Sequence, residues 1–156
     1  MSARRGRTPS DVPTRQTRGV DVDELARALA DRLARIVPDG FHVEASRGML
    51  WYSCEAGRFP GQQGTYEVGS SGSYLRENLG RRGDDAPIDV QIAAAAENAL
   101  DELQDYIDEA THDPWPGDRT VPPAHAEVRD SMLHIWYGRP GEVVLACEPI
   151  SLRDII

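Results

Sequence analysis

Apolar residues recur at helical spacing in two stretches of the chain. In residues 22–37 they return every three to four positions, with Asp21 placed to cap a helix and Pro38 and Gly40 placed to end it. The second and longer stretch, residues 89–111, carries one apolar stripe made of Ile92, Ala95, Ala96, Ala99, Leu103, Tyr106 and Ala110. The pattern therefore predicts two main helices.

After each predicted helix, apolar and polar residues alternate, as is typical of strands. The first half predicts a hairpin around a turn at 46–48 and a third strand, with strands at 41–45, 49–54 and 65–68. Ser70 or Ser71 would then cap a short helix through 75–79. The second half predicts three further strands, the last two joined by a turn at 138–141, with strands at 124–128, 132–137 and 142–148.

The order helix, three strands, helix, three strands predicts an α+β fold, with one antiparallel sheet of about five or six strands and helices covering one face. Residues 1–19 are Arg-rich and nearly devoid of apolar residues, so we expect a disordered arm before a single domain over residues 20–156. Residues 42–50 and 125–133 share four of nine identities. Either gene duplication or the limited number of sequences that form a short hairpin after a helix would explain this likeness.

The net charge of −9 is the sum of two opposed parts. Residues 1–19 hold five arginines and one acid, whereas residues 20–156 hold twelve arginines and twenty-five acids. An acidic body repels phosphate backbones, so only the arm is expected to contact nucleic acid. All seventeen basic residues are arginine. The absence of lysine excludes Schiff-base chemistry and the lysine of a P-loop.

Composition also limits where the protein is expected to work. No apolar run approaches the roughly 20 residues that cross a bilayer, and no apolar stretch follows the early arginines as in a secretory signal. Two cysteines, Cys54 and Cys147, are too few for a disulfide scaffold. We therefore expect a cytoplasmic protein without a membrane partner.

Candidate chemistry is sparse, and we predict no catalytic residue, no cofactor and no metal ligand. The spacing of His125 and Glu127 fits a zinc deaminase signature, but the Pro-Cys-x-x-Cys segment that completes such a site is missing. The glycine-rich run 69–73 could bind an anion with help from Arg58 or Arg76, although the need for glycine in turns is the favoured explanation of its composition.

Partner binding is better represented in the sequence. Three aromatic residues lie among glycines, the second predicted helix has an acidic side, and a tryptophan lies between two prolines. The predicted partner-binding residues are Phe59, Tyr66, Tyr74, Asp101, Asp105, Asp108 and Trp115. We expect a non-enzymatic protein-binding module, chaperone-like or adaptor-like, and leave a homodimer open. The alternative is a small enzyme or ligand-binding protein, with a pocket between sheet and helices built on residues 69–73, Arg76 and His134.

Two segments resemble a group of small uncharacterised actinobacterial proteins. They read DELQDYIDEATHDPWPG (101–117) and GRFPGQQG (57–64), and the likeness would span residues 22–156. This resemblance implies an intracellular bacterial protein and no particular activity. Separately, the order of elements is similar to that of the secretion-chaperone fold, whose members are small, acidic and often dimeric.

Overall fold

A computed structural model describes residues 19–55, 71–75, 79 and 86–156 of the chain. Its two main helices are α1 (Val22–Ala34) and α3 (Ile88–Thr111). Its strands are β1 (Phe41–Ser46), β2 (Met49–Cys54), β3 (Ser71–Tyr74), β4 (Ala124–Arg129), β5 (Met132–Arg139), β6 (Glu142–Ala146) and β7 (Ile150–Ser151). The predicted arm falls almost entirely outside the described residues.

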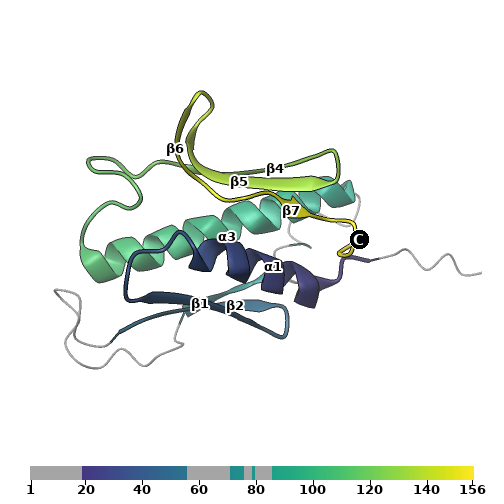
Figure 1. Cartoon of the computed structure of the whole chain (residues 1–156), viewed down its shortest axis with the longest axis horizontal. Helices are drawn as coiled ribbons and strands as arrows, with labels where there is room; N and C mark the ends of the chain where they lie inside the picture. Colours follow the sequence, from purple (N-terminus) through teal and green to yellow (C-terminus); the bar gives the residue numbers. More distant parts are fainter. Residues whose placement is uncertain (1–18, 56–70, 76–78, 80–85) are drawn as a thin grey trace, which may run out of the picture.

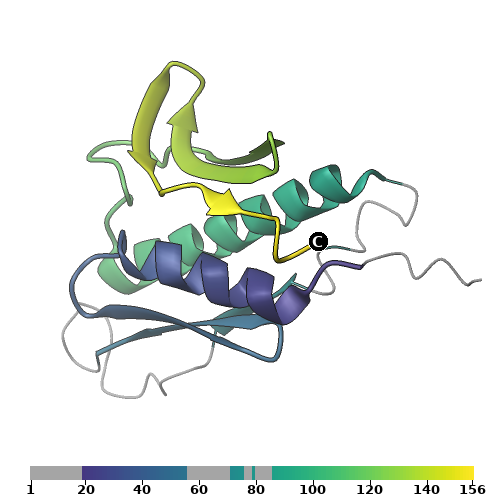
Figure 2. The same ribbon diagram turned by 45° about the vertical axis from the view of Figure 1, so that its right-hand side comes forward.

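The strands form two antiparallel sheets with the helices between them (Figures 1 and 2). The first sheet has the order β1-β2-β3, and the second has the order β4-β5-β6 with β7 paired to β5. The α+β class with two main helices and antiparallel pairing is confirmed. The prediction of a single sheet covered on one face is wrong.

The reason for the second sheet is that α3 has two buried sides. Besides the predicted apolar stripe, a second set of buried residues follows at helical spacing: Leu100, Gln104 and Ile107. Tyr52 in β2 donates a hydrogen bond from its hydroxyl to the carbonyl of Ala99, at 2.9 Å. Tyr137 in β5 donates to the next carbonyl, that of Leu100, at 2.8 Å. Each sheet therefore packs on its own side of the same helix.

Helix α1 begins as the sequence predicts. The Asp21 carboxylate accepts a hydrogen bond from the backbone N–H of Glu24 at 3.1 Å. The helix ends at Ala34, earlier than the predicted residue 37, and a turn follows. Near this end the Arg32 guanidinium donates to the Glu148 carbonyl at 3.2 Å, and Arg35 pairs with the Glu148 carboxylate at 3.3 Å. These contacts tie α1 to the connection between β6 and β7.

The hairpins β1–β2 and β4–β5 have the same pairing register. The pairs Phe41↔Cys54 and Ser46↔Met49 of the first hairpin correspond, 83 positions later, to Ala124↔Tyr137 and Arg129↔Met132. Each turn has two residues, and all four of these residues have positive φ: Arg47, Gly48, Asp130 and Ser131. Turns of this kind match the twist of the strands that they join. The likeness between the two halves thus extends from sequence to backbone geometry.

Other strand predictions need correction. The predicted strand at 65–68 lies outside the described residues, and the third strand of the structure is β3, at positions predicted to begin a helix. Strand β6 ends at Ala146, and β7 follows as a strand that the sequence did not predict. Leu75 and Leu79 are helical and buried.

In the described part of the chain, no helix combines the length and apolar character needed to cross a membrane.

The β5–β6 hairpin is bent where its register shifts, between Tyr137 and Gly138. Gly138 has φ +125°, and a Cβ atom there would collide with the carbonyl oxygen of Glu142 and approach the Val144 nitrogen to 2.8 Å. Only glycine allows the two strands to come this close at the bend.

We expect Gly138→Ala to destabilise the fold by about 2 kcal/mol more than Gly141→Ala, as measured by urea unfolding. Gly141 is the matched control because it also has positive φ, +83°, but nothing lies within 4 Å of its added Cβ. Equal losses in the two variants would show that the backbone approach at Gly138 is unimportant.

Candidate functional site

The second sheet has an outer face that the helices do not cover. Along β5, Leu133, Ile135 and Tyr137 are buried toward the helices, so the alternate residues lie on the opposite face: Met132, His134 and Trp136. Pairing adds residues of β4 to this outer face, because His125 is opposite Trp136 and Glu127 is opposite His134. An aromatic and titratable row therefore runs across an outward sheet face.

This face contains a depression of about 330 Å³, here called the aromatic depression. It is lined by Glu127, Arg129, His134, Ile135, Trp136, Pro140, Gly141, Val143, Ala146 and Cys147. The β5–β6 hairpin curves away from the rest of its sheet (Figures 1 and 2), so residues of the hairpin line one side. The His125 and Trp136 rings stack nearby with centroids 5.5 Å apart.

Two features of this region are unusual for a solvent-facing sheet. The indole Nε1 of Trp136 is buried and has no hydrogen-bond partner among the described residues, which leaves a donor unsatisfied. On β6, Val143 and Val144 are 54% and 51% exposed. Neighbouring exposed apolar residues beside an aromatic floor are typical of an interaction surface.

A second hollow, here called the edge groove, lies between α3 and β4. It has a volume of about 290 Å³ and is lined by Asp89, Val90, Ala93, Ala94, Glu97, Ala126, Glu127 and Val128. Strand β4 is at the edge of its sheet. The carboxylate of Glu97 accepts a hydrogen bond from the Ala126 backbone N–H at 3.3 Å. The N–H and C=O groups on the side of β4 that faces away from β5 have no strand partner among the described residues. Within the described chain, the bond from Ala126 to Glu97 is the one hydrogen bond that these groups make.

The predicted acidic residues of α3 separate into two roles. Asp101 and Asp105 are exposed, whereas Asp108 accepts a hydrogen bond from the Trp115 backbone N–H at 2.7 Å and so holds the following loop. Partial burial raises the pKa of Asp101, and the nearby carboxylates of Glu97 and Asp105 raise it further. Partial burial also raises the pKa of Asp108, against the lowering effect of the Trp115 N–H.

Trp115 packs against the core. Its ring meets the Tyr137 ring edge to face, with centroids 5.0 Å apart. Gln104, which is 4% exposed, donates from Nε2 to the carbonyls of Trp115 and Pro122 at 2.9 and 2.7 Å. The structure therefore places Trp115 at the edge of the core, and its predicted role in partner binding stays a prediction.

The remaining predicted partner-binding residues stay predictions. Phe59 and Tyr66 lie outside the described residues, and Tyr74 is placed in β3 by its backbone alone. The alternative prediction is a pocket between sheet and helices. Its residues 69, 70 and Arg76 also lie outside the described part of the chain. His134 lies on the outer sheet face rather than toward the helices.

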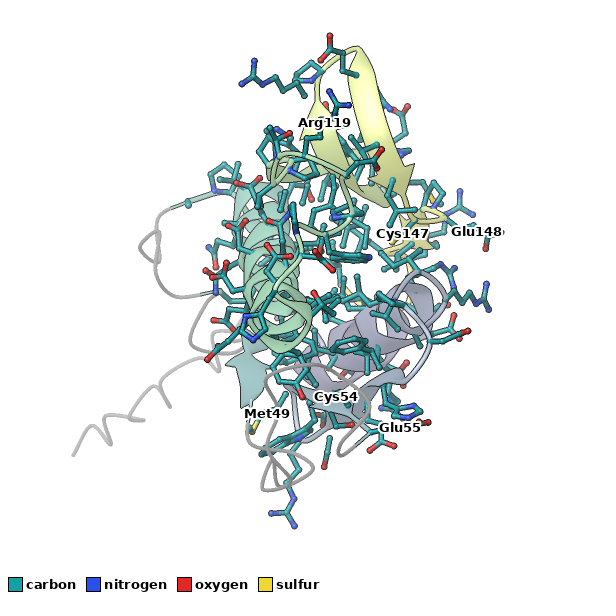
Figure 3. The ribbon with its side chains drawn as sticks, turned by 90° about the vertical axis from the view of Figure 1, so that its left-hand side faces the viewer. Met49, Cys54, Glu55, Arg119, Cys147 and Glu148 are labelled. Atoms are coloured by element: carbon teal, nitrogen blue, oxygen red, sulfur yellow. The ribbon has the colours of Figure 1, made fainter. Side chains whose placement is uncertain are left out.

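Both cysteines are thiols rather than disulfide partners; Cys54 lies in β2, whereas Cys147 directly follows β6, and Figure 3 labels both. Cys54 is buried and accepts a hydrogen bond from the Tyr106 hydroxyl at 3.3 Å. Burial raises the pKa of the Cys147 thiol to about 11, although Arg32 opposes the shift. A thiol with this pKa is protonated at neutral pH and is a poor nucleophile. The described residues contain no group of three or more His, Cys, Asp or Glu that could hold a metal ion.

The alternation of residues in β5 contains a signal for the outer face. Strict alternation in β5 places Trp136 on the same side as His134, and tryptophan on the solvent side of a strand is an exception to the usual polar pattern. The contact between Glu97 and Ala126 had no such signal, because it joins residues 29 positions apart through tertiary packing.

Comparison with known proteins gives no further assignment: the chain matches no protein-family model, no curated protein and no solved structure.

We expect Asp101→Asn to be about 0.5 kcal/mol more stable than the natural protein at pH 7 in urea unfolding, because one carboxylate is removed from a repelling row. The folded pKa of Asp101 lies above its ordinary value of 3.8. Its protonation therefore stabilises the folded state below about pH 3.8, and this contribution is lost as pH rises through the folded pKa. The advantage of the variant should accordingly vanish at pH 3.

Glu142→Gln, which removes an exposed carboxylate of β6, is the control and should show no comparable gain at pH 7. Lower stability of Asp101→Asn at pH 7 would contradict repulsion within the acidic row.

Proposed function

We propose that the chain is a non-enzymatic protein-binding module, chaperone-like or adaptor-like. The observation that carries the proposal is the aromatic depression, which lies on a sheet face that neither α1 nor α3 covers (Figure 1). Its floor offers Trp136 and the carbon atoms of Pro140 and Val143, while Glu127 and Arg129 contribute charge. An aromatic centre with charged residues around it is the usual composition of a protein interface.

The unsatisfied indole N–H of Trp136 supports a polar as well as an apolar contact. A tryptophan at an interface gains stability when its ring is covered and its N–H meets an acceptor such as a backbone carbonyl. A partner segment that displaces the side chains around Nε1 could supply that acceptor. This favours a peptide-like partner over a purely apolar one.

The exposed carboxylates of Asp101 and Asp105 support a partner with basic residues. Surface charges of this kind act mainly on the rate of encounter. A cytoplasmic location, a homodimer and a relationship to secretion chaperones remain parts of this proposal, supported by composition and by the order of elements.

The second candidate is a small enzyme or ligand-binding protein. It is favoured by one observation, that Glu127, Arg129 and His134 line the same depression. Two observations weigh against it. The Cys147 thiol in the lining is protonated at neutral pH, and the space between the described sheets and helices is filled by one cluster of buried apolar side chains.

The test is selection of binding peptides from a random library displayed on phage, using the full chain as bait. We expect selected peptides to bind the natural protein and to lose at least tenfold in affinity for Trp136→Ala, as measured by fluorescence anisotropy. The matched control is Trp51→Ala, which removes the same side chain from the outer face of the first sheet.

Equal losses in Trp136→Ala and Trp51→Ala would contradict the assignment of the depression as the binding surface. Failure to select any peptide, together with small-molecule fragments that shift the His134 resonances, would favour the second candidate.

A further inference from the structure

We propose that the edge groove is a docking site for residues 1–18 of this same chain. The arm would lie along α3 and β4, with its arginines paired to the carboxylates of the groove. The edge groove shares Glu127 with the aromatic depression, but it lies between β4 and α3 rather than over β5 and β6, and the proposal does not rest on the proposed function.

Charge complementarity is the first argument. The residues that line the edge groove include three acids, Asp89, Glu97 and Glu127, and no base. The exposed carboxylate of Asp101 continues this row one turn after Glu97. Residues 1–18 hold one acid and five arginines: Arg4, Arg5, Arg7, Arg15 and Arg18. Such an arm is the most basic segment that the chain contains.

The shape of the groove fits arginine in particular. Its apolar lining is made largely of short side chains, Ala93, Ala94 and Ala126, with Val90 and Val128 beside them. Val90 is 43% exposed. Arginine can lay its aliphatic stem on such a surface while its guanidinium reaches a carboxylate in bidentate geometry. One type of side chain therefore satisfies both the apolar floor and the acidic lining.

The arm also starts at a suitable place. Both ribbon views show that the described chain begins at the end of the molecule where α3 begins, the end that carries Asp89 and Val90 (Figures 1 and 2). A segment of 18 residues can extend to about 60 Å, whereas residues 89–97 of a helix span about 13 Å. The arm is long enough to enter the groove from that end.

The edge of β4 offers backbone groups to such a segment. Ala126 donates its outward N–H to the Glu97 carboxylate, and Val128, two residues along, has no hydrogen bond on its outward side within the described chain. An extended arm could use these outward groups while an arginine pairs with Glu97. Docking would thus cover a strand edge that otherwise stays open to other chains.

The test uses a fluorescein-labelled peptide of residues 1–18 and two forms of the full chain. One form is the natural protein, and the other carries glutamine in place of all five arginines of the arm. A tethered arm competes at an effective concentration of about 1 mM. We therefore expect the peptide to bind the glutamine form at least tenfold more tightly than the natural protein, as measured by anisotropy, with both affinities falling as salt rises.

Substitutions on the glutamine form locate the site. Asp89→Asn with Glu97→Gln removes two charges from the groove and should weaken peptide binding at least tenfold. The second of these changes keeps a side-chain oxygen that can still accept from the Ala126 N–H, so the contact between α3 and β4 is preserved. Glu44→Gln with Glu142→Gln removes two exposed charges elsewhere and should leave binding unchanged.

Circular dichroism confirms that each form is folded before its affinity is compared. Equal peptide affinity for the natural and glutamine forms, or binding that survives Asp89→Asn with Glu97→Gln, would overturn the proposal.

Discussion

The packing of α3 between two sheets is the constraint on which the rest of the structure depends. Ala95, Ala96 and Ala99 are fully buried, and side chains this small let neighbouring backbone come close. Two tyrosine hydroxyls, one from each sheet, then donate to the adjacent carbonyls of Ala99 and Leu100. A buried hydroxyl must find a partner to avoid a desolvation cost, so these two bonds fix how each sheet lies on the helix.

This arrangement determines where binding surfaces can form. Because the two helices lie between the sheets, they do not cover the outer faces of the sheets. The second sheet carries Trp136 and two histidines there, and its curvature comes from the register shift beside Gly138. The same enclosure brings the acidic side of α3 next to the edge of β4, so that Glu97 reaches Ala126. The aromatic depression and the edge groove thus both result from the packing of α3 between the two sheets.

Local signals in the sequence predicted local structure well. The cap at Asp21 located the start of α1, and alternation with short turns located both hairpins. The division into two sheets was missed because the second buried side of α3 includes a polar residue, Gln104, which interrupts the apolar pattern. Which strands share a sheet depends on this second buried side of α3 and not on the sequences of the strands. The candidate site was only partly predictable, because the acidic residues are visible in sequence whereas the bend and the contact of Glu97 arise from tertiary packing.

Gln104 also shows how much can depend on a single nitrogen atom. Its Nε2 donates to both Trp115 and Pro122, and these two bonds fix the path of the proline-containing connection from α3 to β4. Deamidation would replace that nitrogen with an oxygen that cannot donate, and the resulting carboxylate would face two carbonyl oxygens in a buried place. The chemical ageing of one side chain would therefore release the loop that carries Trp115, without any change in the encoded sequence.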